Sequence, residues 1–279
     1  MKRESFSRCH PAVNFVFYIG TFVMEMCFVH PAFLICSMIC GLSYYLIVKK
    51  WDWKYLGMLF ALFLGMTLIN PFFNPRGEHI LFIYGNGRPY TFEAICYGMA
   101  MASIFVTVLL WFATYNEIMT SDKFLYCFGK FAPTVTLILT MVLRLVPEFQ
   151  KKTKQISGAR KCIGMSAENG TAYEKAEHGL TLVSVLTSWA LEGGVVMADS
   201  MRSRGFGCGK RTAFSIYKMK TTDWKILLAM LILMGMAAVS RLTDSWTMPG
   251  LIAYFIYLSI PIQMNIMEEL RWRILKSKI

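Results

Sequence analysis

The sequence predicts an all-α polytopic membrane protein with about six membrane-spanning helices and a cytosolic domain of long amphipathic helices. First, 56% of the 279 residues are hydrophobic, and the apolar stretches approach the roughly 20 residues that a spanning helix needs. Second, residues 144–210 are dense in Lys, Arg, Asp and Glu. A charge at the bilayer centre costs about 2.5–3.5 kcal/mol, so this segment belongs in water or against another protein.

Six apolar stretches are expected to cross the membrane. Lys2, Arg3 and Arg8 precede the first stretch, and the chain ends in a basic tail over 268–279. Positive charge is retained on the cytosolic side of a membrane, so both termini are expected in the cytosol. The expected spans are 12–28, 32–48, 55–69, 92–113, 224–240 and 251–267.

Two of these spans carry small residues at four-residue spacing. The third has Gly57, Ala61 and Gly65, and the fourth has Gly98 and Ala102. Small residues at this spacing let two helix backbones approach closely. We expect contacts within the chain, with a dimer face as the alternative at Gly57–Ala61–Gly65.

Two segments between the expected spans are harder to assign. Residues 70–90 are full of Pro, Gly and Asn and are expected to form an outer loop, within which 80–84 suits a short strand or an interfacial segment. Residues 124–146 are apolar, but cytosolic charges flank them on both sides. We expect a helix along or dipping into the membrane face, with a helical hairpin as the alternative.

The charged segment contains two amphipathic patterns. Residues 149–164 predict one helix. A second helix of about 25 residues is predicted from Glu174, because apolar residues recur there at i, i+3, i+4 and i+7. We divide the chain into N-terminal membrane helices (1–123), a cytosolic domain (124–210), and C-terminal membrane helices with the basic tail (211–279).

Each amphipathic pattern ends in an arginine motif. Ala159 and Arg160 close the first, and Ser203, Arg204 and Gly205 close the second. Arginine offers a planar, permanently charged fork to a carboxylate, so an arginine at a cytosolic helix tip suits docking in an acidic groove. A single such arginine often only satisfies helix carbonyls, but two motifs in one segment favour docking.

These paired motifs resemble those of the transmembrane T component of energy-coupling factor transporters. The lead-in 143–148, with Arg144 and Pro147, is similar to that family's Arg-Phe-x-Pro segment, and 8–11 resembles its opening loosely. The resemblance is strongest over 120–210. Lys161 and Ser203 depart from the usual residues of the two motifs.

The resemblance implies a non-catalytic coupling subunit of an ATP-driven importer for a vitamin or metal ion, in a bacterial or archaeal cell membrane. The motifs would cap coupling helices that press on two cytosolic ABC-type ATPase subunits, with ATP bound there and no cofactor on this chain. A small membrane-embedded subunit would bind the substrate. The site residues so implied are Arg160, Arg204, Ala159, Ser203 and Gly205 for the ATPases, Arg144 and Pro147 in support, and Leu182, Leu186, Trp189 and Val196 for the substrate-binding subunit.

Other classes of function fit the sequence less well. The net charge of +12 falls between apolar spans, as topology requires, and not on one nucleic-acid-binding face. The eight cysteines show no metal-ligand spacing, and 205–212 fails as a phosphate loop because Arg204 stands where that motif needs glycine. We see no charged residue deep in the expected spans and therefore expect no proton or ion relay. The alternatives are an ATPase-independent membrane channel or scaffold and, third, a lipid-headgroup enzyme.

Overall fold

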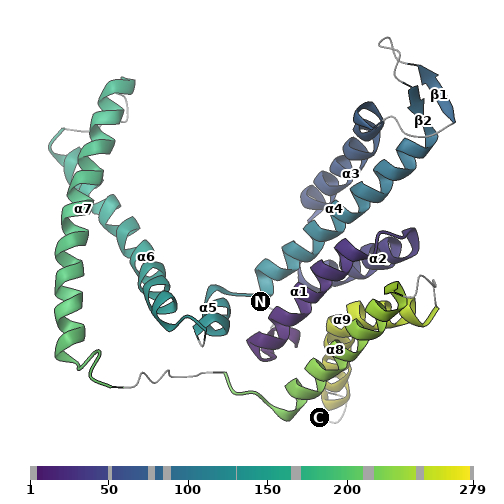
Figure 1. Cartoon of the computed structure of the whole chain (residues 1–279). Coiled ribbons are helices and arrows are strands. Elements are labelled where there is room, and N and C mark those ends of the chain that lie inside the picture. Colours follow the sequence, from purple (N-terminus) through teal and green to yellow (C-terminus); the bar gives the residue numbers. More distant parts are fainter. Residues whose placement is uncertain are drawn as a thin grey trace. The chain divides into compact units, whose positions relative to one another are not determined.

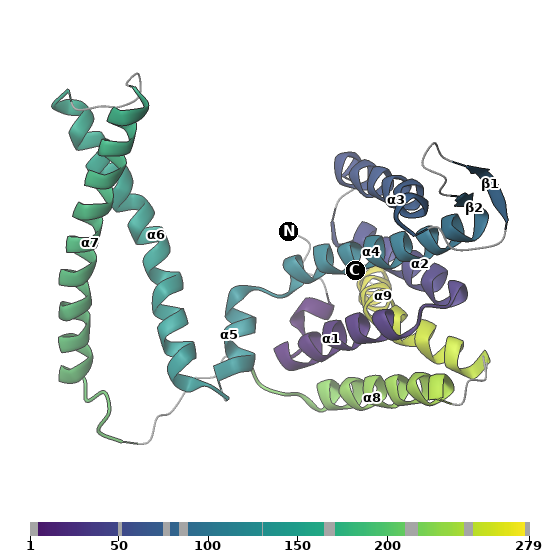
Figure 2. The same ribbon diagram turned by 45° about the horizontal axis from the view of Figure 1, so that its top comes forward.

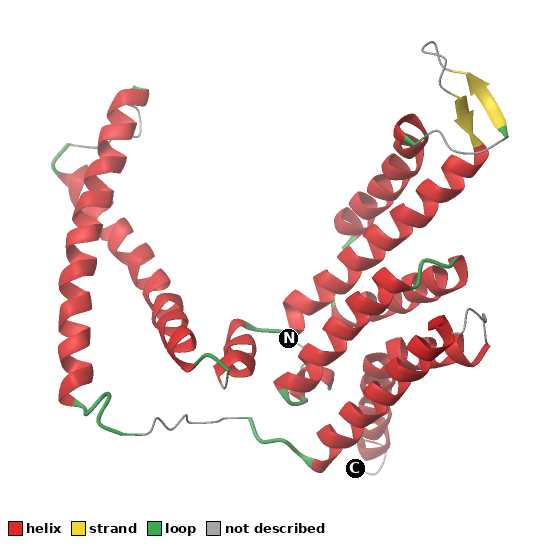
Figure 3. Cartoon of the chain, viewed as in Figure 1, coloured by secondary structure: helices red, strands yellow, loops and turns green. Residues whose placement is uncertain are grey.

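The computed structural model describes residues 5–49, 52–74, 79–83, 89–129, 131–164, 171–209, 217–242 and 248–276. These residues form nine α-helices, one short 3₁₀ helix and a two-stranded sheet (Figures 1 and 3). The predicted all-α class is confirmed. Six of the helices are long and apolar enough to cross a membrane, which makes this a multi-pass membrane protein.

The six helices differ in one member from the expected spans. They are α2 (Pro31–Val48), α3 (Trp53–Phe73), α4 (Phe92–Ile118), α7 (Ala172–Ser203), α8 (Thr221–Leu242) and α9 (Met248–Lys276). The expected first span is α1 (Pro11–Cys27), which is apolar but has only 17 residues. The additional member, α7, lies in the charged segment, and its cytosolic position stays a prediction.

The chain divides into two compact units. The first contains Met1–Cys127 and Tyr217–Ile279, and the second contains Phe128–Ile216. The first unit holds η1 (Phe6–Arg8), α1–α4, α8 and α9, together with most of α5 (Ser121–Gly129). The second holds α6 (Pro133–Cys162) and α7.

In the first unit, only residues 28–30 separate α1 from α2 (Figure 2). The first two helices begin alike, because His10 and His30 each precede a proline at the first helical position. Their imidazole Nδ1 atoms accept from the backbone N–H groups of Ala12 (3.2 Å) and Ala32 (3.3 Å). Each histidine thus satisfies one free donor of the helix start, and proline lacks an N–H to satisfy.

The core of the first unit is aromatic. Trp111 of α4 is fully buried against Phe17 and Tyr18 of α1 and Tyr44 of α2, with ring centroids 5.7–6.4 Å apart. Phe17 also stacks on Tyr257 of α9 at 5.3 Å. Edge-to-face and offset contacts of this kind stabilise a packed centre beyond the area that they bury, and here they join four helices.

The two small-residue faces have opposite outcomes. A Cβ on Gly98 would lie 2.9 Å from the Asn70 side chain and 3.0 Å from the Thr67 carbonyl oxygen, so the predicted close approach in α4 is confirmed against α3. A Cβ on Gly57 or Gly65 would meet nothing within 4 Å. The predicted internal contact of α3 at these glycines is therefore wrong for the part of the chain that is described.

The outer segment contains the short strand that the sequence allowed. β1 (Ile80–Ile83) pairs with β2 (Pro89–Thr91) in an antiparallel hairpin, and the connecting residues 84–88 lie outside the described part. The predicted loop began at 70, but α3 continues to Phe73 through Pro71. Asn70 stays helical because its carbonyl accepts from the Asn74 N–H at 3.0 Å.

The second unit is an antiparallel pair of long helices (Figure 1). The sequence analysis treated 124–146 and 149–164 as separate segments, yet α6 (Pro133–Cys162) runs without interruption through Pro147. A proline inside a helix removes one hydrogen bond, and strong helix formers on both sides keep the helix continuous. The start of α7 is fixed by a capping box, in which Thr171 N–H donates to Glu174 Oε2 (2.9 Å) and Glu174 N–H donates to Thr171 Oγ1 (3.4 Å).

Candidate functional site

Every residue that the sequence assigned to the site lies on the pair α6–α7 or directly after α7. Trp189 of α7 contacts Phe149 of α6 edge-to-face at 5.4 Å. The Lys152 ammonium lies 5.7 Å from the Trp189 ring centroid, within the range of a cation–π interaction. The middle of the pair is therefore joined by one aromatic contact with a cation beside it.

Apart from this seam the pair is open. Neither α6 nor α7 has a buried residue among those described. Large apolar side chains of α7 are mostly exposed, at 73% for Leu180, 69% for Leu191 and 63% for Val195. Exposed apolar surface on this scale is typical of contact with lipid or another protein.

The first arginine motif lies on the last turns of α6. Arg160 is half-buried, and its Nε atom has no hydrogen-bond partner among the described residues. Ala159 is exposed. The helix ends at Cys162, and Gly164 follows two residues later with a left-handed φ of 77° and an N–H that donates to the Lys161 carbonyl at 3.1 Å. The predicted glycine stop is thus confirmed, and Arg160 lies in the last turn of α6.

The second motif ends α7 in a Schellman motif. Gly205 has a φ of 77° and donates to the Arg202 carbonyl at 2.9 Å, while Phe206 donates to the Met201 carbonyl at 3.0 Å. This pairing satisfies the last carbonyls of the helix. Arg204 therefore does not have to cap them, and its side chain is exposed.

The two motifs lie at opposite ends of the pair. α6 and α7 run in opposite directions in Figures 1 and 2, and the end of α6 lies beside the start of α7. Arg160 belongs to the end where α6 leads into α7, and Arg204 to the end where α7 leaves. The sequence predicted the two motifs but not this separation.

Arg204 shares a groove with Arg144. The groove has a volume of about 390 Å³, and the two arginines contribute to a wall that is otherwise formed by Met141, Gly193, Val196, Met197, Ser200 and Met201. Three predicted site residues, Arg144, Val196 and Arg204, are thus brought together, while Arg160 is not among them. Pro147 is exposed on α6.

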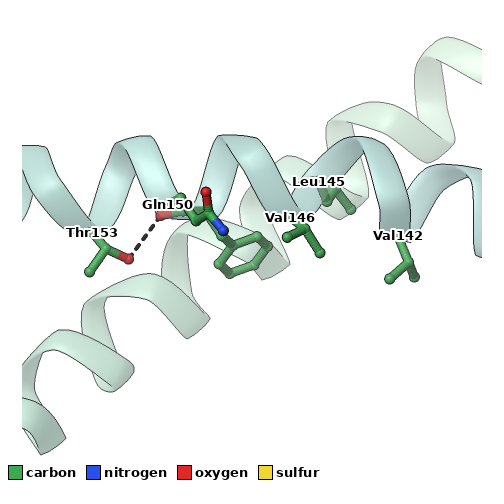
Figure 4. Close-up of a pocket in the computed structure, with 6 residues that line it drawn as sticks. Val142, Leu145, Val146, Gln150 and Thr153 are labelled. Atoms are coloured by element: carbon green, nitrogen blue, oxygen red, sulfur yellow. Dashed lines mark hydrogen bonds between the residues drawn. The ribbon is translucent and has the colours of Figure 1, made fainter. Parts of the chain in front are cut away.

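A second groove of about 310 Å³ follows α6 and is mostly apolar (Figure 4). Figure 4 shows Val142 and Val146 directed to the same side of the helix as Thr153, whose hydroxyl donates to the Phe149 carbonyl at 2.8 Å. The remaining lining residues are Leu145, Phe149 and Gln150.

The four residues assigned to the substrate-binding subunit fall into two groups. Leu182, Leu186 and Trp189 are half-buried, and Trp189 packs against Phe149. Val196 is 60% exposed. The most exposed large aliphatic side chains of α7 are those of Leu180 and Leu191, which the helical periodicity did not select.

No protein-family model and no curated protein matches the chain.

Sequence reasoning missed Glu25. This residue lies within the expected first span and is fully buried on α1, so the expectation of no charged side chain deep in the spans is wrong. Its Oε1 accepts from Ser37 Oγ of α2 at 2.9 Å, and Ser37 Oγ also accepts from Trp111 Nε1 of α4 at 3.4 Å. The one available signal was a single Glu in an otherwise apolar stretch.

A second missed residue is Lys123, which joins three segments at the end of the first unit where α1 begins. Its Nζ donates to the Ser7 carbonyl (2.6 Å), to Ser7 Oγ (2.9 Å) and to the Ile118 carbonyl (3.0 Å). Burial lowers the pKa of this lysine and, beside it, raises the pKa of the Cys9 thiol to about 11. Lys123 is held as a structural cation that fixes the N-terminal segment to the end of α4.

The described residues contain no group of three or more His, Cys, Asp or Glu side chains that fits a metal ion.

Proposed function

We propose that this chain is the transmembrane coupling subunit of an ATP-driven energy-coupling factor importer for a vitamin or metal ion. In this role it is not an enzyme. It carries motion from two cytosolic ABC-type ATPase subunits to a small membrane-embedded substrate-binding subunit. The observation that carries the proposal is the placement of two arginine motifs at opposite ends of one open helix pair.

That placement suits two separate docking partners. α7 has 32 residues, and at about 1.5 Å per residue it is about 48 Å long. Arg160 and Arg204 are separated by most of that length, so one small groove on one partner cannot receive both. Two ATPase subunits, each receiving one helix end, satisfy this geometry.

The chemistry of each end also supports docking. Arg160 is half-buried, and its Nε–H is itself buried without a partner among the described residues. Arg204 is exposed beyond a helix end whose carbonyls are already satisfied. A guanidinium in an acidic groove forms charge-assisted, bidentate hydrogen bonds. Removing one partner of such a buried contact costs on the order of 2–5 kcal/mol.

The apolar surfaces of the same pair suit the membrane-embedded partner. Val196, Leu180 and Leu191 are exposed on α7, and Val142 and Val146 line the groove of α6. A tilt of the pair, caused at its charged ends, would move these surfaces against a hydrophobic subunit. Motion would then pass from the ATPases to the substrate-binding subunit without a nucleotide site on this chain.

The charge distribution of the first unit supports the membrane orientation that this role requires. The end where α1 begins also carries the starts of α3 and α8 and the ends of α2, α4 and α9. The described acidic and basic residues at the opposite end are few: Glu25, Glu93 and Arg241. We therefore place the first end, and both termini, in the cytosol. Its described basic residues are Arg8, Lys49, Lys54, Lys123, Lys218, Lys220, Lys225, Arg271, Arg273 and Lys276.

The alternative is an ATPase-independent membrane channel or scaffold. The buried Glu25 favours this alternative, because ion pathways through membranes contain such groups. Against it, the centre of the first unit is filled by Trp111, Tyr18, Tyr44 and Tyr254, each 1% exposed or less. We therefore prefer the coupling role.

The test is purification of the chain from its native membrane in mild detergent, followed by mass spectrometry of the bound proteins. We expect two ATPase chains and a small apolar protein, whose identity would name the substrate. Arg160→Glu combined with Arg204→Glu should remove both ATPases.

The matched control is Arg271→Glu, which reverses one exposed arginine near the end of α9 and should leave the complex intact. ATPases still bound to the double variant would refute the docking role. A wild-type chain that purifies alone, with no ATP hydrolysis, would favour the channel or scaffold.

A further inference from the structure

The carboxyl group of Glu25 is enclosed by side chains from four helices. Glu25 belongs to α1 and is 0% exposed. Ser37 of α2 donates to its Oε1, and Trp111 of α4 donates to the same serine hydroxyl. Tyr254 of α9 is 1% exposed and lies within electrostatic reach of both Glu25 and Ser37.

Aromatic rings cover the next turn of α1. Phe28 and Phe33 stack with centroids 4.8 Å apart, and both contact the ring of Tyr254, at 5.8 and 5.3 Å. Phe28 and Phe33 are each 5% exposed. These rings separate the carboxyl group from the end of the bundle, so water does not reach it freely.

Nothing described near Glu25 compensates a negative charge. The titratable side chain that acts on Glu25 is Tyr254 of α9, and Cys36 and Cys40 of α2 lie near Tyr254 in turn. None of these groups is cationic. Oε2 has no hydrogen-bond partner among the described residues. An unpaired carboxylate in such a place costs several kcal/mol, whereas a neutral acid does not carry that cost.

We propose that Glu25 forms a proton-binding site inside the helix bundle, with the proton on Oε2 while Oε1 accepts the bond from Ser37. Each oxygen then has one role, and no counter-ion is required. The site makes the packing of α1, α2, α4 and α9 depend on one proton. It is independent of the proposed coupling role, because none of its residues belongs to the α6–α7 pair.

An infrared spectrum of the full chain tests this site directly. At about pH 8, exposed Asp and Glu side chains are ionised, because their ordinary pKa values are about 4. In an ester-free detergent, a carboxylic-acid C=O band at that pH therefore reports a buried neutral acid. We expect this band in the wild type and its loss in Glu25→Gln, which keeps the shape and neutrality of the group.

Chemical modification gives an independent readout that needs no variant. A hydrophobic carbodiimide reacts with a protonated carboxyl group. The carboxyl oxygen bonds to the central carbodiimide carbon, the proton passes to a nitrogen, and the acyl group then migrates to nitrogen without loss of any atom. Treatment with dicyclohexylcarbodiimide at about pH 8 should add one reagent mass to the peptide of Glu25 and none to those of the exposed Glu148 and Glu192, which are ionised.

The infrared band decides the outcome. Its absence from the wild type at about pH 8 would overturn the proposal, whatever the extent of modification. Thermal stabilisation by sodium ions in the wild type but not in Glu25→Gln, together with absence of the band, would identify a bound monovalent cation in place of the proton. A band that persists in Glu25→Gln would assign the neutral acid to another residue and also overturn the proposal.

Discussion

At the scale of single residues, Ser203 is the position at which the second arginine motif departs from the family that the sequence resembles. Its hydroxyl donates to the Asp199 carbonyl one turn back, at 2.9 Å. Side-chain bonds of this kind stay within the helix, so the hydroxyl proton of Ser203 is used inside α7, although the residue itself is exposed.

Cys9 gives a pH-dependent prediction at the same scale. Burial raises the pKa of its thiol from 9.0 to about 11, with a smaller contribution from Asp223. Between these values the unfolded chain releases the proton and the folded chain keeps it. The free energy of unfolding should therefore fall as the pH rises through this window, by up to about 1.4 kcal/mol per pH unit.

The measurement is the thermal aggregation midpoint in detergent between about pH 8 and 11, compared with that of Cys9→Ala. We expect the midpoint of the wild type to fall relative to that of Cys9→Ala as the pH rises. Parallel curves would show that the thiol does not stay protonated in the fold. The neighbouring Lys123 has a lowered pKa and contributes with the opposite sign, but it is common to both proteins.

The residue scale is also where sequence reasoning was weakest. Ser37, which donates to Glu25, is 12 positions away along the chain, and Trp111, which donates to Ser37, is 74 positions from that serine. A hydropathy pattern averages over a window and records one Glu as a small dip. The enclosure of that carboxyl group becomes visible only when four helices are placed together.

At the scale of helices, the crossing of α3 and α4 gives a prediction with a matched control. Gly98→Ala places a Cβ against Asn70 and the Thr67 carbonyl oxygen. Because backbone has to move, we expect a loss of about 1–3 kcal/mol in the free energy of unfolding. Gly65→Ala on α3 meets nothing within 4 Å and should be neutral or stabilising by up to about 1 kcal/mol.

Both variants are compared by their thermal unfolding midpoints in the same detergent. Equal midpoints for Gly98→Ala and Gly65→Ala would contradict the close crossing.

The α6–α7 pair gives a second prediction at this scale. Trp189→Ala removes the ring contact with Phe149 and the cation–π contact with Lys152, which together stabilise the pair by about 1–3 kcal/mol. We expect amide hydrogen exchange in α6 and α7 to accelerate while that of α1–α4 stays unchanged. Leu191→Ala, on a 69% exposed side chain, should leave exchange unaltered. Unchanged exchange in Trp189→Ala would mean that other contacts hold the pair.

Most helices could be predicted from the sequence because each apolar stretch is bounded by charges or breakers. The starts at His10-Pro11 and His30-Pro31 and the stops at Gly164 and Gly205 follow from local capping chemistry. The continuity of α6 through Pro147 could not be predicted, because a lone proline signals a break only locally. The same limit applies to the α3 glycines, since spacing indicates that a close approach is available but not which helix uses it.

At the scale of the whole molecule, the two arginine motifs predict separable docking. Arg160 and Arg204 end different helices at opposite ends of the pair. Arg160→Glu alone should therefore release one ATPase subunit and Arg204→Glu alone the other, because each reversal leaves the remaining end intact. Mass spectrometry of the purified complexes measures the two stoichiometries. If either single reversal released both subunits to the same extent, the two ends would not be independent docking sites.

The first unit contains the places where the chain leaves for the second unit and where it returns. Tyr126 Oη donates to the Tyr217 carbonyl at 3.2 Å, the two rings lie 5.1 Å apart, and His10 Nε2 lies 3.3 Å from the same hydroxyl. The last residues before the second unit and the first residues after it are therefore held side by side within the first unit. Both connections to the second unit start from this one place.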